Sequence, residues 1–210
     1  MSGLRERKKQ QTREQIAAAA FELFASHGFD RVSVAAVARH AGVSEATVFN
    51  YFPTKEDLVI GRLDEFEAGL VAAVRDRPPG TSVIAAFGAF LTHRPGLLGS
   101  EDPAAAERLV AVNRIIAGSP AIQARERRVY DEHARALADV LAVGTRPGDL
   151  RPRVVATALI GVHRAVVEMV RSEVLAGRSG PALVRRVRAS LSEALGVLDA
   201  GLATYPDGGG

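Results

Sequence analysis

Hydrophobic residues recur along this chain at intervals of three and four positions, which is the spacing of the buried face of an α-helix. No segment keeps the alternation that a half-buried β-strand requires, so the pattern predicts an all-α protein. The run Asp76-Arg77-Pro78-Pro79-Gly80 is the clearest interruption. We therefore expect an N-terminal domain over 1–53, a connecting helix over 54–75, a larger helical domain over 76–205 and a flexible tail over 206–210.

The N-terminal domain is predicted to consist of three helices with recognisable ends. A polar side chain that accepts a backbone N–H begins a helix, and a glycine with positive φ ends one. In the first helix, Gln15 follows Thr12 by three residues, as in a capping box. The predicted caps and helix-ending glycines are Thr12, Gly28, Ser33, Gly42, Ser44 and, for the connecting helix, Thr54.

The C-terminal half is predicted to form five helices, three of which begin at a proline, where the missing N–H costs nothing. They span about 81–93, 103–117, 120–143, 152–175 and 181–204. The last two carry apolar stripes: Val155, Leu159, Val162, Val166 and Met169, then Leu183, Val187, Leu191, Leu195 and Leu198. We expect these two helices of two copies to form a four-helix interface and a homodimer. The alternative is that both stripes face their own bundle.

Residues 34–52 have the pattern of a helix-turn-helix, in which the second helix enters the major groove of DNA. Ala38 is small enough to let the two short helices approach closely, and Gly42 supplies the positive φ of the turn. Val48 and Phe52 would then pack the second helix onto the first. This unit predicts binding to double-stranded operator DNA.

The run Gly42-Val43-Ser44-Glu45-Ala46-Thr47-Val48-Phe49-Asn50-Tyr51-Phe52-Pro53-Thr54-Lys55-Glu56-Asp57-Leu58 resembles the signature of the TetR family of bacterial transcriptional regulators. The run Ile16-Ala17-Ala18-Ala19-Ala20-Phe21-Glu22-Leu23-Phe24, followed by Gly28-Phe29 and Val34, is also similar to it. The resemblance covers about residues 12–60. It implies a three-helix DNA-binding domain joined by a fourth helix to a C-terminal bundle that binds a ligand and forms the dimer.

The resemblance also implies roles for individual residues. Ser33 and Ser44 would offer groups to phosphates, and Tyr51 and Lys55 would clamp the DNA backbone. Family members often have Tyr where this chain has Phe49, so we expect Phe49 to belong to the core. The expected DNA-binding residues are Ser33, Arg39, Ser44, Glu45, Ala46, Thr47, Asn50, Tyr51 and Lys55. Of these, Glu45 suits a cytosine amine, Ala46 a thymine methyl and Asn50 an adenine.

Charge supports a DNA partner mainly through its distribution. The formal net charge is only +3, but residues 5–13 contain five basic residues and one acidic residue. We expect this stretch to form a basic arm ahead of the first helix. The chain has no cysteine, its start lacks the apolar core of a secretory signal, and its most apolar stretch is too short to span a membrane. We therefore expect a cytoplasmic protein that does not enter a membrane.

An enzyme is disfavoured, because the chain has no Walker loop, dinucleotide-binding glycine motif, nucleophile elbow or His-Glu-x-x-His sequence. Its five histidines are scattered, so we expect no metal and no cofactor. The C-terminal bundle is expected to bind a small hydrophobic ligand that releases a repressor from its operator. Candidate ligand contacts are Phe87, Phe90, Asn113, Tyr130, His133, His163 and Met169. An activator and a DNA-binding dimer without a small ligand remain alternatives.

Overall fold

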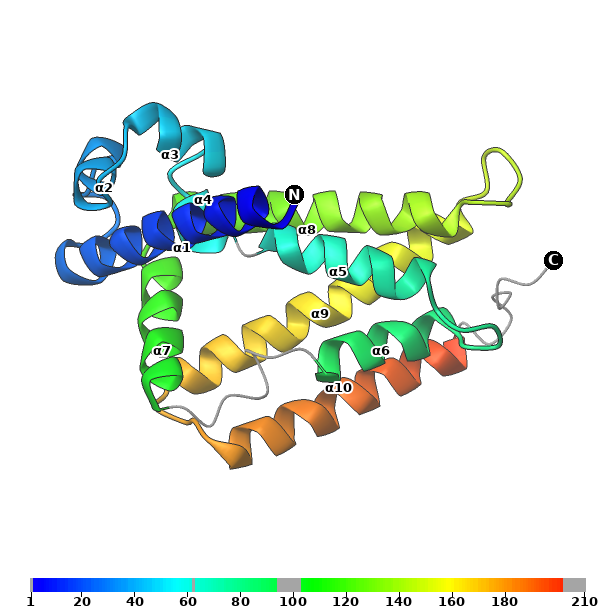
Figure 1. Ribbon diagram of the computed structural model, residues 1–210. Coiled ribbons are helices and arrows are strands. Elements are labelled where there is room, and N and C mark those ends of the chain that lie inside the picture. Colours follow the sequence, from blue (N-terminus) through cyan, green and yellow to red (C-terminus); the bar gives the residue numbers. More distant parts are fainter. Residues whose placement is uncertain (1, 62, 94–102, 202–210) are drawn as a thin grey trace. The chain divides into compact units, whose positions relative to one another are not determined.

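The computed structural model describes residues 2–61, 63–93 and 103–201, and it is all-helical, as predicted (Figure 1). The predicted tail over 206–210 lies outside the described residues. The chain divides into two compact units: residues 1–62 with 111–126, and residues 63–110 with 127–210. The helices are α1 Ser2–His27, α2 Val34–His40, α3 Glu45–Tyr51, α4 Asp57–Ile60, α5 Leu63–Arg75, α6 Val83–His93, α7 Pro103–Ala117, α8 Pro120–Leu141, α9 Arg151–Leu175 and α10 Pro181–Gly201.

The first helix begins ten residues before the predicted cap, so the expectation of an arm ahead of it was wrong. The basic stretch is the exposed first half of α1. Thr12 lies inside this helix, where its hydroxyl donates to the carbonyl of Lys8 at 3.0 Å. Gln15 completes no capping box, because its amide instead donates to the carbonyl of Ala41 at 2.8 Å. Arginine, lysine and glutamine are good helix formers, so the polar residues before Thr12 continue the helix without an apolar face.

The ends of the two short helices are as predicted. Ser33 and Ser44 have extended backbones, and their hydroxyls accept the N–H of Ala36 at 3.2 Å and of Thr47 at 3.0 Å. Gly42 has φ +66, a conformation that side chains disfavour. The caps and this glycine therefore fix the turn between α2 and α3.

The single connecting helix predicted over 54–75 is instead two helices. Thr54 is not the cap that the sequence predicted, because α4 begins at Asp57 and Glu56 occupies the capping position. Thr54 still exchanges hydrogen bonds with this helix start: Asp57 Oδ2 accepts from Thr54 N, and Thr54 Oγ1 accepts from Asp57 N. The following helix, α4, nevertheless ends at Ile60, and Gly61 lies in a turn before α5. Glycine has a low helix propensity, and here there is no room for a side chain, because a Cβ would lie 2.9 Å from a ring carbon of Phe52.

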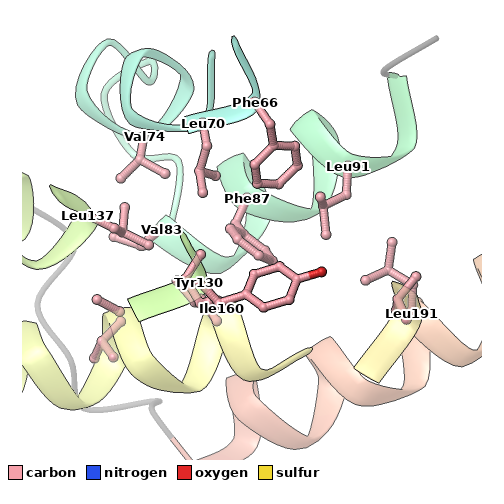
Figure 2. Close-up of a cluster of buried hydrophobic side chains, with 14 of the residues drawn as sticks. Phe66, Leu70, Val74, Val83, Phe87, Leu91, Tyr130, Leu137, Ile160 and Leu191 are labelled. Atoms are coloured by element: carbon pink, nitrogen blue, oxygen red, sulfur yellow. The ribbon is translucent and has the colours of Figure 1, made fainter. Parts of the chain in front are cut away.

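The core of the second unit is formed by α5, α6, α8, α9 and α10 (Figure 2). The predicted stripe of α10 contributes to it: Leu183, Val187 and Leu191 are at most 8% exposed, and Leu195 packs against them. The stripe of α9 is buried in the same core through Val155, Leu159 and Val166. The expectation that these stripes form the dimer interface was therefore wrong. Within one chain, the two helices pack against each other and α10 also packs against α6, so the stripes are already covered.

The remaining helices lie close to their predicted positions, and α7, α8 and α10 begin at Pro103, Pro120 and Pro181 as expected. Among the described residues, no helix is both long enough and apolar enough to cross a bilayer.

Candidate nucleic-acid interface

The helix-turn-helix is a rigid unit because its inner face is buried. Val37, Ala38 and Val48 are at most 2% exposed, and Phe52 is 3% exposed. Between the helices, the N–H of Val43 donates to the carbonyl of Ala38 at 3.0 Å. The packing fixes which side of α3 faces outward.

The outward side of α3 presents most of the residues predicted to read bases. Glu45, Ala46 and Asn50 are exposed, whereas Thr47 is half-buried. The hydroxyl of Thr47 lies 2.8 Å from that of Ser44, so Thr47 also supports the start of the helix. A carboxylate, a methyl and an amide therefore share one short surface, and these are groups that suit base edges in a major groove.

Phe49 does not belong to the core, contrary to the expectation from the sequence. Its side chain is 46% exposed, whereas that of its neighbour Val48 is 1% exposed. The helical period explains the difference: residue 49 follows Glu45 by four positions and Ala46 by three, which puts it on their face.

Arg13 anchors the end of α3, a role that the sequence did not reveal. Its guanidinium donates to the carbonyl of Tyr51 at 3.0 Å and to that of Gly61, and it lies 4.7 Å from the ring centre of Phe52. Carbonyls at the end of a helix lack partners within the helix, so a cation from α1 stabilises this end. These two hydrogen bonds join residues 38 and 48 positions apart in the sequence, so no local sequence pattern predicts them.

The residues predicted to contact phosphates have different surroundings. Arg39 and both capping serines are exposed, and Tyr51 is half-buried. The ammonium of Lys55 donates to the carbonyl of Phe29 at 2.7 Å and lies 4.3 Å from the centre of the Phe29 ring. This contact gives Lys55 a structural role in the loop between α1 and α2, while its predicted phosphate contact stays a prediction.

A largely buried ion pair joins α4 to α8 within the first unit. Asp57 Oδ1 accepts from Arg125 Nε at 2.9 Å, and the two side chains are 8% and 17% exposed. The other carboxylate oxygen of Asp57 accepts from the hydroxyl of Thr54 at 2.7 Å. The pair fixes the segment that directly follows α3, and its partners are too far apart in sequence to have been predicted together.

Four of the predicted ligand contacts meet in the second unit, around the ring of Phe66 on α5. The ring of His163 stacks on Phe66 with centroids 4.2 Å apart, and that of His133 lies 5.6 Å away. Tyr130 contacts both imidazoles edge-on, and Phe90 meets Phe66 at 5.3 Å. We call Phe66, Phe90, Tyr130, His133 and His163 the imidazole–aromatic cluster.

The cluster combines burial with polarity. His133 is 1% and His163 is 5% exposed, and Nε2 of His133 lies 3.6 Å from a carboxylate oxygen of Glu67. Such groups inside an apolar core suit a ligand that has both an apolar body and a polar end.

The other predicted ligand contacts do not join this cluster. Phe87 is fully buried in the core of the same unit, and Met169 is half-buried against that core. Asn113 is buried too, but it belongs to the first unit. Among the described residues, no group of three or more His, Asp or Glu side chains is arranged to hold a metal ion.

Two family models match the chain. Residues 16–61 match bacterial regulatory proteins of the tetR family, and residues 77–203 match the MftR C-terminal domain. The transcriptional regulator TcmR of Streptomyces glaucescens is 30% identical over 174 residues, covering 78% of this chain and 75% of that protein. The putative mycofactocin biosynthesis regulator MftR of Mycobacterium tuberculosis is 29% identical over 164 residues, covering 77% of this chain and 81% of that protein.

A solved structure agrees on the fold. The regulator FadR of Bacillus subtilis, in complex with stearoyl-CoA, superposes with a TM-score of 0.52 over 87% of this chain and 97% of its own. Its sequence is 20% identical, so the likeness concerns the fold alone.

Proposed function

Because this chain belongs to the TetR family of bacterial transcriptional regulators and has an MftR-type C-terminal domain, we propose that it is a homodimeric repressor released from operator DNA by a small hydrophobic ligand. Membership of this family shows that the chain is a DNA-binding transcriptional regulator and not an enzyme. We further propose that the protein represses transcription, that a ligand releases it from DNA, and that it acts in the cytoplasm, where operator DNA is found.

The exposed side of α3 is the observation that carries the proposed DNA contact. Glu45, Ala46 and Asn50 would contact base edges there, with Thr47 beside them. Ser33, Arg39, Ser44, Tyr51 and Lys55 would contact the backbone and position the helix without reading sequence. The exposed basic residues at the start of α1 would add attraction that depends on salt.

Selection of bound duplexes from a random DNA pool, with the full-length protein, tests this contact. We expect a two-fold symmetric consensus with half-sites about one helical turn apart, which is about 34–36 Å. Recovery of unrelated sequences would contradict a repressor that reads its operator.

The proposed dimer uses the sides of α9 and α10 that point away from the core. On α9, exposed residues recur with heptad-like spacing: Val154, Gly161, Ala165, Ser172 and Leu175. Exposed small residues recur on α10 at Ala182, Ala189 and Gly196. Small side chains let helices approach closely, and a two-fold axis would pair this surface with its copy. A symmetric operator favours the same arrangement.

Sedimentation of three arginine variants tests this surface. Ala165→Arg should give folded monomers, because it places an unpaired charge in the contact. Ala68→Arg, at an exposed position of α5, should remain dimeric. Leu191→Arg should unfold the second unit rather than convert the dimer into folded monomers, because Leu191 is 1% exposed within one chain. A dimer in Ala165→Arg would contradict the assignment.

The imidazole–aromatic cluster supports a ligand with an apolar body and a polar end. Tyr130, His133 and His163 would contact the polar end, while Phe66 and Phe90 would contact the body. The ligand can act only through its different affinity for the DNA-bound and the DNA-free conformation.

Long-chain fatty acids and stearoyl-CoA, the compound in the FadR complex, are suitable first probes. A probe that fits should raise the melting temperature and weaken operator binding. His163→Gln should reduce both effects and leave DNA affinity without the probe unchanged. If no apolar probe changes operator affinity, the alternative of a dimeric regulator without a small ligand is favoured.

A reporter gene behind the selected operator separates repression from activation. Deletion of the regulator should raise expression if it is a repressor, and lower expression would make it an activator.

A further inference from the structure

Phe49 is out of place for a side chain that only stabilises the fold. Among the residues that the structure describes, it is the one exposed phenylalanine or tyrosine. A half-exposed phenyl ring leaves nearly half of its apolar surface in water in the free protein, and this part contributes nothing to the hydrophobic stabilisation of the fold. The ring therefore suits a surface that becomes buried only on binding.

The position of Phe49 shows which surface that is. It lies on α3 one turn after Glu45 and Ala46 and directly before Asn50, and all three neighbours are exposed. The face is held in place by buried Val48 on the opposite side and by the contacts of Arg13 with the helix end. A major groove that contacts Asn50 and Ala46 would therefore lie beside this ring.

A phenyl ring cannot donate or accept a hydrogen bond as phosphates and most base edges require. The apolar group of the major groove is the C5-methyl of thymine, and phenylalanine is among the side chains that contact it. We propose that Phe49 determines operator specificity by packing against the methyl group of a thymine in each half-site. This inference rests on the proposed contact of α3 with DNA and adds a preference that Asn50 and Glu45 do not supply.

Removal of that methyl group alone tests the contact. In the selected operator, each thymine of both half-sites is replaced in turn by deoxyuridine, which lacks only the C5-methyl. At one symmetric position, wild-type protein should lose roughly fourfold in affinity per half-site, and roughly fifteenfold when both half-sites are changed. Phe49→Ala lacks the ring in both half-sites, so it should bind the thymine operator at least roughly fifteenfold more weakly than wild type does. The variant should also bind the thymine operator and the uracil operator with equal affinity.

Three comparisons complete the test. Phe49→Tyr keeps the ring and should keep the sensitivity to uracil. Ala46→Ser is the matched control, because its methyl also faces outward; if this variant alone loses sensitivity to uracil, Ala46 is the methyl contact and the proposal is wrong. The melting temperature of Phe49→Ala should fall by only a few degrees, because part of the ring is buried but nearly half of it stays in water.

The remaining outcomes separate this inference from the proposed function. If Phe49→Ala weakens binding to thymine and uracil operators equally, the ring packs on the sugar-phosphate backbone and the proposed specificity is overturned. If wild type selects a symmetric operator but no thymine is sensitive to uracil, the inference fails while the proposed function stands. If no duplex is selected, the proposed contact of α3 with DNA fails, and the inference fails with it.

Discussion

Replacement of Asp57 by asparagine is the sharpest test of how the segment after α3 is held. The variant keeps the shape of the side chain and removes its charge. In the wild type, the carboxylate accepts hydrogen bonds from Thr54 N at 3.0 Å, Thr54 Oγ1 at 2.7 Å and Arg125 Nε at 2.9 Å. The amide oxygen of asparagine can serve Thr54, but its NH2 group then faces the guanidinium of Arg125, donor against donor.

The cost follows from the burial of the pair. Removing one partner of a buried ion pair costs about 3–5 kcal/mol, because the remaining charge loses its attraction to that partner. Since the Arg125 side chain is 17% exposed, water compensates part of this loss. We therefore expect Asp57→Asn to lower the free energy of unfolding by about 3 kcal/mol. For a chain of this length, that corresponds to a fall in melting temperature of roughly 6–12 °C.

Thermal unfolding followed by circular dichroism, at one fixed protein concentration, measures this effect. Arg125→Met is the second arm, and the double variant should be no less stable than Asp57→Asn, because it removes the guanidinium that the new amide would face. The coupling free energy of the cycle should be about 1.5–3 kcal/mol. A melting temperature of Asp57→Asn within 2 °C of wild type, or a coupling near zero, would refute the structural role of the pair.

Two further predictions follow from local geometry. Gly61→Ala should lower the free energy of unfolding by about 1–3 kcal/mol, because the new methyl would meet the carbonyl oxygen of Asp57 and lie 2.9 Å from a ring carbon of Phe52. A melting temperature equal to that of wild type would contradict this and show that the turn adjusts freely. Hydrogen bonds from Arg151 lower the pKa of Asp149 from 3.8 to about 2. Because this pKa is lower in the folded state, the contribution of Asp149 to stability is present above pH 4 and is lost as the pH falls towards 2. Carboxyl NMR should show the low pKa in wild type and a higher one in Arg151→Met, which loses the guanidinium but keeps the backbone N–H that donates to Asp149.

The features that the sequence predicted are those set by neighbouring residues. Ser33, Gly42 and Ser44 act within one turn of themselves, so the two short helices and the turn between them follow from local chemistry. The α1 boundary was missed because its first half lacks apolar periodicity and is helical through residue propensity. A local pattern also cannot say where an isolated aromatic such as Phe49 will point.

The features that the sequence missed depend on contacts between distant segments. The stripe through Leu191 correctly predicted an amphipathic helix, but periodicity does not say whether the same chain or a second copy covers the apolar side. Arg13 and Arg125 are charged residues in polar helices, and only the folded chain brings them to the end of α3 and to Asp57. The meeting of His133 and His163 around Phe66 likewise required the packing of three helices.

The exposed side of α3 is proposed to read operator sequence. Fluorescence anisotropy of Asn50→Ala on the selected operator and on a scrambled duplex, at several salt concentrations, tests it most directly. We predict a loss of about 1–3 kcal/mol on the operator and almost none on the scrambled duplex. The control, Arg39→Ala, should weaken binding to both duplexes alike and lower the salt dependence. If Asn50→Ala bound both duplexes as wild type does, α3 would not be the recognition helix.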